Sequence, residues 1–572
     1  MRRRKSLNAR ETWIQQTTRK KITGLRKFSL VALSAAVTGV VLLGADWPTQ
    51  SGSPQRDGWA RSEDTFTKAN AGDIDLLYKY KADNRSRGLS SLTSPLIDGM
   101  LITYLGFKEM LVFGGSSDNV YSVDADLNRL IWKRHLDYKG DKPQSKAVTA
   151  VCPGGLTASV MMPGSSSATR SFTRKPKASA AQAGHISALL ASGFGRLGAF
   201  FAVGSDGYLH LLNTSTGQDL IPPVKFLPAN AKVSSLNFTD NSVYAATLDD
   251  CGGNPNALYA IDLASEDQKV SSFVTNGSGA AGIAGTAIGT DGTVYAQIPN
   301  GHSNGAGNFN DTVVALNPKD LSIKDYFTPS GSPAVSNKNI ETASATPLVF
   351  SWKGKDVVVA GGKDGRLYWL DSTSLGGSDH HKALYQTEPV ASGGMNHTGH
   401  GFRGAFSSWD DTETGTRWIY ASLAGPPDAS AKFSTANGTA SNGGIVAFKV
   451  EDRNGQPTLT PAWISRDMVS PAPVATANGL VFALSTGESS SAIKENGTPY
   501  SVPERAKMAT HATLYVLDGA TGKELYSSGD AVTSYSHGSG LAVANGRVYF
   551  TTHDNTAYCF GFRKLQPQLT EQ

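Results

Sequence analysis

The sequence predicts an all-β protein, an eight-bladed β-propeller built from four-stranded antiparallel blades. Three observations predict this fold. A short β-rich unit that ends in a polar turn recurs along the chain, and a segment of small residues precedes each copy. In addition, the last copy lacks its outer strand, and a suitable unpaired strand occurs near the start of the chain.

The clearest copy of the unit lies at residues 513–526, where Leu514 and Val516 alternate with polar residues as in a strand. Asp518 to Gly522 then forms a turn that reverses the chain into a second strand, which predicts a β-hairpin. Seven further copies occur at residues 119–132, 207–220, 257–262, 311–317, 365–371, 444–449 and 555–560.

Segments rich in Ser, Thr, Gly and Ala precede the eight units, and small residues are expected in strands that line the crowded axis of a propeller. We therefore predict axial strands at residues 91–96, 155–159, 233–236, 285–288, 344–348, 401–407, 469–473 and 536–540. Residues 76–80 read as an outer strand with no unit before them. They are expected to complete the last blade and so to close the ring.

The first 45 residues resemble an export signal. Ten Lys and Arg side chains precede an uncharged apolar run at residues 28–43, which small residues follow. The run is shorter than the roughly 20 residues of a membrane-spanning helix. We predict cleavage after Ala45, with an uncleaved membrane anchor as the alternative. The expected organisation is therefore a signal or anchor at 1–45, the propeller at 46–562 and a polar tail at 563–572, in a periplasmic or extracellular protein.

The charge of the chain depends on this first segment. The formal net charge is +5, but residues 1–45 hold ten basic residues and one acidic residue, so the rest carries −4. A mildly acidic body without a basic stripe gives no support for binding to nucleic acid. We expect a monomer that contacts a membrane only through an uncleaved first segment.

Three cysteines remain to be placed. Cys152 and Cys251 lie in similar glycine-rich turns, and in an oxidising compartment the two are candidates for a disulfide, with free thiols as the alternative. Cys559 alternates like a strand residue and is expected in the core. Insertions at residues 164–184, 425–443 and 487–510 are too polar to pack and are expected to be mobile surface loops.

The repeat resembles that of the quinoprotein-dehydrogenase-like propellers with pyrroloquinoline quinone repeats. Asp518, Thr521 and Gly522 match the Asp, Thr and Gly of that repeat, and Val516 and Tyr526 take its alanine and tryptophan places. The opening residues 46–59 are similar to the mature start of these proteins. The resemblance extends over residues 46–562.

The resemblance implies the fold more firmly than the activity. Quinone-using members place adjacent cysteines under the cofactor and hold a calcium ion with acid and amide side chains. No two cysteines are adjacent in this chain, and it has no Cys-x-x-Cys-His haem motif. The hallmark residues for pyrroloquinoline quinone with calcium are not evident, so the cofactor is left unknown.

The densest polar cluster, residues 393–403, leads into the sixth predicted axial strand. We predict that His397, His400 and Arg403 reach the mouth of the central channel and that His537, on the eighth axial strand, approaches the same place. Arginine binds carboxylates through two parallel hydrogen bonds, and histidine transfers protons near neutral pH. The alternative is that these side chains only bind exposed backbone. No metal site is predicted, because Asp249-Asp250 and Asp410-Asp411 are typical of turns rather than calcium loops.

Three functions stay open. The first is a ligand- or protein-binding module, outside the cytoplasm, without assignable catalysis. The second is a quinone-dependent oxidoreductase acting on an alcohol or sugar, and the third is an envelope-assembly scaffold. The sequence has no nucleophile elbow, P-loop or zinc-protease helix, so hydrolases and nucleotide-driven enzymes have no motif support.

Overall fold

The computed structural model describes residues 46–563, apart from 104–105, 138–148, 150–151, 164–198, 266, 277–278, 281, 300–308, 310, 331–344, 363, 393–399, 492–493, 495 and 497. The chain divides into two compact units, Met1–Gly44 and Ala45–Gln572. The predicted signal at 1–45, the insertion at 164–184 and all but the first residue of the tail at 563–572 lie outside the described residues. No helix in the described part of the chain is long and apolar enough to cross a membrane.

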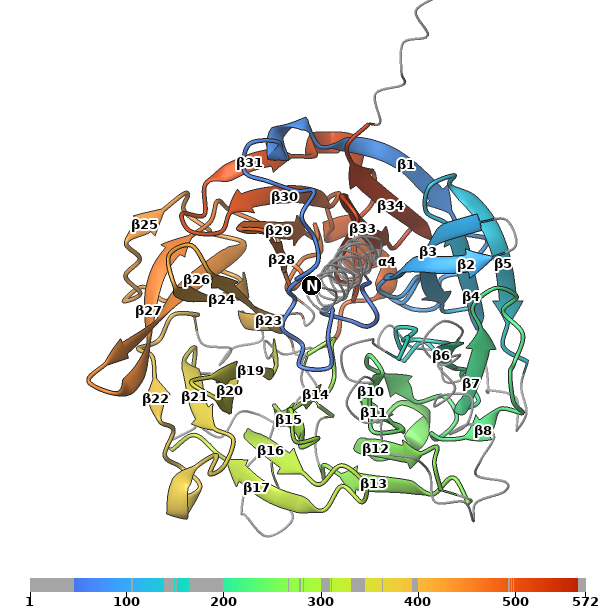
Figure 1. Ribbon diagram of the computed structural model, residues 1–572, viewed down its shortest axis with the longest axis horizontal. Coiled ribbons are helices and arrows are strands. Elements are labelled where there is room, and N and C mark those ends of the chain that lie inside the picture. The colour runs from blue at the N-terminus through green and yellow to red at the C-terminus, as the bar shows by residue number, and fades with distance from the viewer. Residues whose placement is uncertain are drawn as a thin grey trace, which may run out of the picture. The chain divides into compact units, whose positions relative to one another are not determined.

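Antiparallel sheets follow one another around a central axis in unit Ala45–Gln572, as Figure 1 shows, so the chain is a β-propeller. Among the described residues, seven sheets have four or more strands. The first four of these, in chain order, are β2 (Leu96–Thr103), β3 (Gly106–Gly115), β4 (Asn119–Asp124) and β5 (Arg129–His135); β9 (Lys232–Val233), β10 (Asn237–Thr239), β11 (Ser242–Leu248), β12 (Ala257–Asp262) and β13 (Val270–Val274); β14 (Ala287–Ile288), β15 (Val294–Ile298), β16 (Thr312–Leu316) and β17 (Ile323–Phe327); and β19 (Leu348–Trp352), β20 (Lys355–Gly361), β21 (Leu367–Asp371) and β22 (Tyr385–Gln386).

The remaining three blades come from the second half of the chain, apart from β1 in the last one. They are β18 (Ala345–Thr346), β23 (Gly401–Asp411), β24 (Thr416–Ala424), β26 (Gly443–Arg453), β27 (Gln456–Ile464) and β25 (Thr435–Ala436); β28 (Ala475–Ala477), β29 (Leu480–Ser485), β30 (Thr513–Asp518) and β31 (Glu524–Ser527); and β32 (Ala542–Ala544), β33 (Arg547–Thr552), β34 (Thr556–Gly561) and β1 (Asp75–Lys81). The helical elements are short: α4 (Val502–Met508) and the 3₁₀ turns η1 (Ala71–Asp73), η4 (Cys251–Gly253), η5 (Gly377–Asp379) and η6 (Gly529–Ala531).

The prediction of eight blades is therefore wrong: the described residues form seven blades of four or more strands. The unit at residues 207–220 instead belongs to a three-stranded sheet of β6 (Ala199–Val203), β7 (Tyr208–Asn213) and β8 (Val224–Lys225). Its expected axial strand at 155–159 forms no ladder, and a single bridge joins Met161 to Phe201. Gly155 packs so closely against the carbonyl oxygen of Ser116 that a Cβ would lie 1.9 Å from it. The backbone at Gly155 therefore packs against the β3–β4 turn of the preceding blade and does not pair with β6.

Of the other expected axial strands, residues 401–407 lie within β23 as predicted, and residues 233–236, 285–288 and 344–348 are strand in part, in β9, β14 and β18. The remaining three are displaced. Residues 91–95, 469–473 and 536–540 are irregular, and the innermost strands β2, β28 and β32 begin after them. The small residues of these three stretches therefore belong to connections that approach the axis. They are small because the backbone is crowded there, which does not require them to be strands.

The hairpin at residues 513–526 forms as predicted, because β30 and β31 pair across the turn. The carboxylate of Asp518 accepts hydrogen bonds from the backbone N–H groups of Ala520 and Thr521 at 2.9 and 3.0 Å. Gly522 has a φ of 71° and lies under the indole of Trp463, where a Cβ would come within 2.4 Å of the ring. A glycine is needed there for both its conformation and its lack of a side chain.

A tryptophan, Trp463, packs on the turn of Asp518, although the sequence pattern gave the tryptophan place of this repeat to Tyr526. It lies on β27, in the blade before the Asp518 turn, and its indole N–H donates to the carbonyl oxygen of Gly519 at 3.0 Å. Trp132 on β5 does the same to Thr214 at 2.7 Å and covers Gly217. Each tryptophan therefore joins an outer strand of one sheet to a turn of the next sheet through a hydrogen bond and ring packing.

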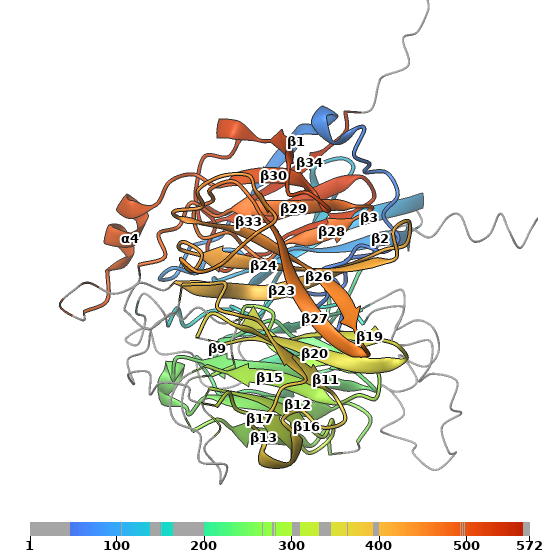
Figure 2. The ribbon, with the colours of Figure 1, turned by 90° about the vertical axis from the view of Figure 1, so that its left-hand side faces the viewer.

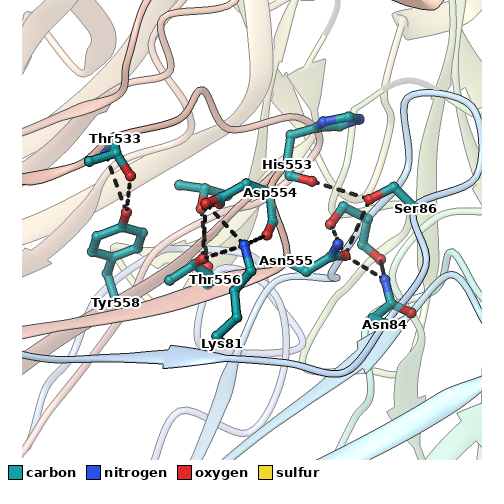
Figure 3. A network of polar contacts seen from close by, with 11 residues as sticks. Lys81, Asn84, Ser86, Thr533, His553, Asp554, Asn555, Thr556 and Tyr558 are labelled. Carbon is teal, nitrogen blue, oxygen red and sulfur yellow. Dashed lines mark hydrogen bonds and ion pairs between the residues drawn. The ribbon is translucent and has the colours of Figure 1, made fainter.

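The predicted closure of the ring is confirmed. β1 pairs antiparallel with β34 from Asp75↔Gly561 to Lys81↔Thr556, so strands from both ends of the unit share one blade. Figure 3 shows contacts beside this pairing: Asn555 in the β33–β34 turn accepts hydrogen bonds from Asn84 and Ser86, and Lys81 pairs with Asp554. Asn555 also accepts a hydrogen bond from Ser91. The last blade is thereby joined to the chain that enters the first one.

A second connection runs along the axis. Residues 47–63, which we call the axial segment, contact the inner end of each sheet in turn, in chain order. The backbone of the segment exchanges hydrogen bonds of 2.7–3.1 Å with Ile97, Met162, Ile288, Val349, Ser408 and Thr476. Side chains supply the two remaining contacts: Thr49 donates to the carbonyl oxygen of Leu236, and Glu63 accepts from the N–H of Gly546. In the part of the chain that the structure describes, this one segment therefore contacts a residue in or next to the inner part of each sheet.

Arg56 is the most buried charge of this axial segment, with 0% of its surface exposed. Its guanidinium donates to the carbonyl oxygens of Thr286, Gln50 and Leu236 and to the hydroxyl of Thr49, at 2.7–2.9 Å. Burial lowers the pKa of Arg56 to about 9, which leaves it charged at neutral pH. A single planar cation thus satisfies backbone acceptors from two neighbouring blades and from the segment itself.

The described cysteines form one disulfide, between Cys152 and Cys251, with 5.3 Å between their Cα atoms. It ties the connection before β6 to the turn η4 after β11, 99 residues later. Cys559 is buried in β34, as expected. The disulfide adds a covalent link beside the three-stranded sheet, which has the fewest strands to hold it.

We predict that Arg56→Met lowers the free energy of unfolding by about 3 kcal/mol or more, because it leaves several buried carbonyl groups without a donor. Denaturant unfolding measures this. Arg453→Met is the matched control, since Arg453 lies on an exposed hairpin and pairs with Glu451, which is partly exposed as well. The control is expected to change stability by less than about 1 kcal/mol. Equal effects of the two substitutions would contradict the role assigned to Arg56.

Candidate functional site

Three neighbouring blades direct polar side chains to one place, whose centre is the carboxylate of Glu488. Glu488 follows β29 and is only 1% exposed. Arg403 comes from β23, Arg505 from α4, and His537 from the connection that leads into β32. In Figure 2, α4 projects on one side of the sheets and the blue N-terminal part of the unit runs down the other side.

The contacts to Glu488 use both of its oxygens. Arg505 donates to Oε1 at 2.7 Å, Arg403 reaches Oε2 at 3.4 Å, and Nδ1 of His537 lies 2.9 Å from each oxygen. The backbone N–H of Glu488 donates to the hydroxyl of Thr486 at 3.2 Å. Among the described residues, these groups form one cluster around a single carboxylate.

The charges of this cluster do not cancel. One carboxylate faces two guanidinium groups, and His537 adds a further charge when it is protonated. Burial disfavours ionisation of Glu488, but His537, Arg505 and Arg403 outweigh burial and lower the pKa of Glu488 below its usual range. The ionised carboxylate therefore orients the cations, and an excess of positive charge is left over.

The cations differ in what they can reach. The side chain of Arg505 is 4% exposed and acts only inside the cluster. The side chains of Arg403 and His537 are 29% and 12% exposed. The contact of Arg403 with Glu488 is also long for a charge-assisted hydrogen bond, so most of its donors remain free of that carboxylate. Arg403 and His537 form the accessible edge of the cluster.

The structure brings together two of the four predicted site residues, Arg403 and His537. His400, the residue before β23, lies against the backbone of Gly425, where a Cβ would come within 2.4 Å of its ring. Burial lowers the pKa of His400. His400 is not one of the groups that contact Glu488 in the described part of the chain, and His397 lies outside the described residues.

Glu488 and Arg505 are the residues that sequence reasoning missed. Both lie in the insertion at 487–510, which was expected to be a mobile loop, so that prediction is wrong for its two ends and for α4. A signal was present in the sequence: Ser501 and Glu504 form a capping box at the start of α4, with a proline inside the first turn. This start places Arg505 on the helix, where its buried side chain reaches Glu488.

The acid pairs act as turn residues. Asp249 and Asp250 adopt positive φ values, and Asp249 pairs with Lys232 at 2.8 Å. Asp411 accepts a hydrogen bond from the backbone N–H of Glu413 at the end of β23. The described residues contain no group of three His, Cys, Asp or Glu side chains suited to holding a metal ion.

Comparison with solved structures identifies the fold. The quinohemoprotein alcohol dehydrogenase ADHIIG from Pseudomonas putida HK5 matches with a TM-score of 0.55 and 14% identity. The quinohemoprotein alcohol dehydrogenase from Comamonas testosteroni matches with a TM-score of 0.54 and 13% identity. Each match covers 92% of this chain and 82% of the other. A europium-containing methanol dehydrogenase matches over 91% of this chain and 98% of its own, with a TM-score of 0.57 and 10% identity. The fold is that of the quinoprotein dehydrogenase propellers. No protein-family model and no curated protein matches the sequence.

A quinone with calcium does not fit the Glu488 cluster. Its one buried carboxylate already binds two guanidinium groups and an imidazole, and those cations repel a divalent metal ion. The cysteines of this chain are not adjacent, and the two that pair lie 99 residues apart. The residues that converge here are suited to an anion instead.

We predict that Glu488→Gln lowers the free energy of unfolding by about 3 kcal/mol at pH 7, because Arg505 is left buried without its counter-ion. The pKa of Glu488 is lower in the folded than in the unfolded chain. Its stabilising contribution is therefore full above the unfolded value of about 4.3 and is lost as the pH falls through the lower folded value.

The measurement is urea unfolding of both proteins at pH 7 and at pH 3, where the difference in stability should shrink. Glu451→Gln is the matched control, because Glu451 pairs with Arg453 on an exposed hairpin. A Glu488→Gln variant as stable as the wild type at pH 7 would show that the cluster is not held by this carboxylate.

Proposed function

We propose that the chain is a binding propeller whose ligand is a small organic carboxylate, held by Arg403 and His537 at the edge of the Glu488 cluster. The observation that carries the proposal is the pair of guanidinium groups around one buried carboxylate, with Arg403 and His537 partly exposed. Positive groups already oriented by a buried partner bind an anion without first losing much conformational entropy.

Each residue has a distinct task in this proposal. Arg403 supplies N–H groups that pair with a carboxylate through two parallel hydrogen bonds. Nδ1 of His537 contacts Glu488, so Nε2 is the ring nitrogen left for the anion, and it donates when the imidazole is protonated. Glu488 and Arg505 are positioning residues. The disulfide between Cys152 and Cys251 supports action in an oxidising compartment outside the cytoplasm.

We predict that the full chain binds propionate, succinate or benzoate in isothermal titration calorimetry, and that Arg403→Gln weakens this binding by about tenfold or more. Arg453→Gln, on the exposed β26–β27 hairpin, is the matched control and should leave the affinity unchanged. If none of the three carboxylates binds the wild type, or if both variants bind as it does, the proposal is wrong.

The fold comparison favours a second candidate, a quinone-dependent oxidoreductase acting on an alcohol or sugar, since three dehydrogenases share this fold over most of the chain. A fold is compatible with many functions, so the likeness alone does not carry the activity over. In the same titration, pyrroloquinoline quinone with calcium is the distinguishing ligand. Stoichiometric binding together with reduction of an electron-accepting dye by an alcohol or sugar would favour the oxidoreductase over the binding module.

A further inference from the structure

Tyr535 lies beside the cluster and has a feature that the proposed function does not use. It is two residues before His537, in the same connection, and it is 7% exposed. Its ring stacks on that of His553, with 4.7 Å between the centroids, and its carbonyl oxygen accepts from the N–H of His553 at 2.8 Å. The ring and the backbone of His553 thus fix the position of Tyr535.

A second backbone hydrogen bond joins the connection that holds Tyr535 to the segment that holds Glu488. The N–H of Ser536, next to Tyr535, donates to the carbonyl oxygen of Thr486 at 2.9 Å, and the hydroxyl of Thr486 binds the N–H of Glu488. Burial and the charge of Glu488 raise the pKa of Tyr535, whereas Arg505 lowers it. The hydroxyl therefore stays protonated at neutral pH and can donate.

That hydroxyl has no hydrogen-bond partner among the described residues. Leaving a buried hydroxyl unpaired costs about 1–3 kcal/mol, so a polar group that completes the site would be favoured there. Nε2 of His553, under the tyrosine ring, is likewise without a partner in the part of the chain described. Two unsatisfied polar atoms therefore adjoin a cluster that has excess positive charge.

We infer that the ligand is a hydroxy- or oxo-carboxylate, with its carboxylate on Arg403 and His537 and its second oxygen accepting a hydrogen bond from Tyr535. This inference rests on the proposed function and deepens it by naming the class of carboxylate. A plain carboxylate would leave the hydroxyl of Tyr535 unpaired, and a site built to bind a polar group discriminates against ligands that lack it. Tyr535 is then the residue that sets specificity.

The test compares ligands that differ by one hydroxyl group: propionate with lactate, succinate with malate, and benzoate with mandelate. In calorimetry with the full chain, at least one hydroxylated member is expected to bind about tenfold more tightly than its partner. Tyr535→Phe should remove this difference and leave the affinity for the plain carboxylate unchanged. Tyr526→Phe, on the outer strand β31, is the matched control, and thermal unfolding checks that both variants fold.

The outcomes separate the two proposals. If plain and hydroxylated members bind equally, or if Tyr535→Phe keeps the preference, the inference about Tyr535 is wrong while the carboxylate site stands. If no member of any pair binds the wild type, the proposed function fails and the inference fails with it. If the preference persists in Tyr526→Phe and disappears only in Tyr535→Phe, the inference is supported.

Discussion

The axial segment at residues 47–63 is the constraint on which the rest of this propeller depends. Sheets that meet at an axis leave backbone donors and acceptors at their inner ends, in a space too narrow for large side chains. A buried backbone group without a partner is costly, so those groups must be satisfied by something that fits along the axis. Here another stretch of backbone does so, with the buried guanidinium of Arg56 at its centre.

The segment also complements the contacts at the rim. The pairing of β1 with β34 closes the ring, and Trp132 and Trp463 fasten one sheet to the turn of the next. Those contacts join neighbours only, whereas the axial segment contacts the inner ends of sheets that do not touch each other. A ring held both at its rim and at its axis is a rigid support. One strand and two connections from three of its blades can therefore place Arg403, Glu488 and His537 within hydrogen-bond distance.

The sequence predicted much of the fold because strands and tight turns leave local patterns. The hairpin of Asp518 and the closing strand at residue 76 are predicted from period-two alternation and turn residues alone. Residues 91–95, 155–159, 469–473 and 536–540 were predicted wrongly as strands, whereas residues 401–407 do form one. Small residues indicate crowding, and crowding does not distinguish a strand from a connection that binds the axial segment. The seven blades and one three-stranded sheet depend on which segments pair, and this is a tertiary property.

The site was predicted only in part, for a similar reason. Arg403 and His537 could be found because they lie next to segments that approach the axis. Glu488 and Arg505 lie in a polar insertion, and composition indicated that it would not pack. The two side chains can be buried because their opposite charges pair, and this pairing forms only when the chain has folded. The capping box at Ser501 and Glu504 is the local signal that could have revealed an ordered helix there.

Hydrogen exchange, measured by mass spectrometry on peptides that contain Ile288, Val349, Ser408 and Thr476, tests the central claim most directly. These N–H groups donate to the backbone of the axial segment. If the segment holds the ring, the four sites exchange slowly in the wild type and all lose protection together in Arg56→Met, including those that do not contact Arg56. Fast exchange at these sites in the wild type, or loss of protection confined to the blades that Arg56 contacts, would contradict this account.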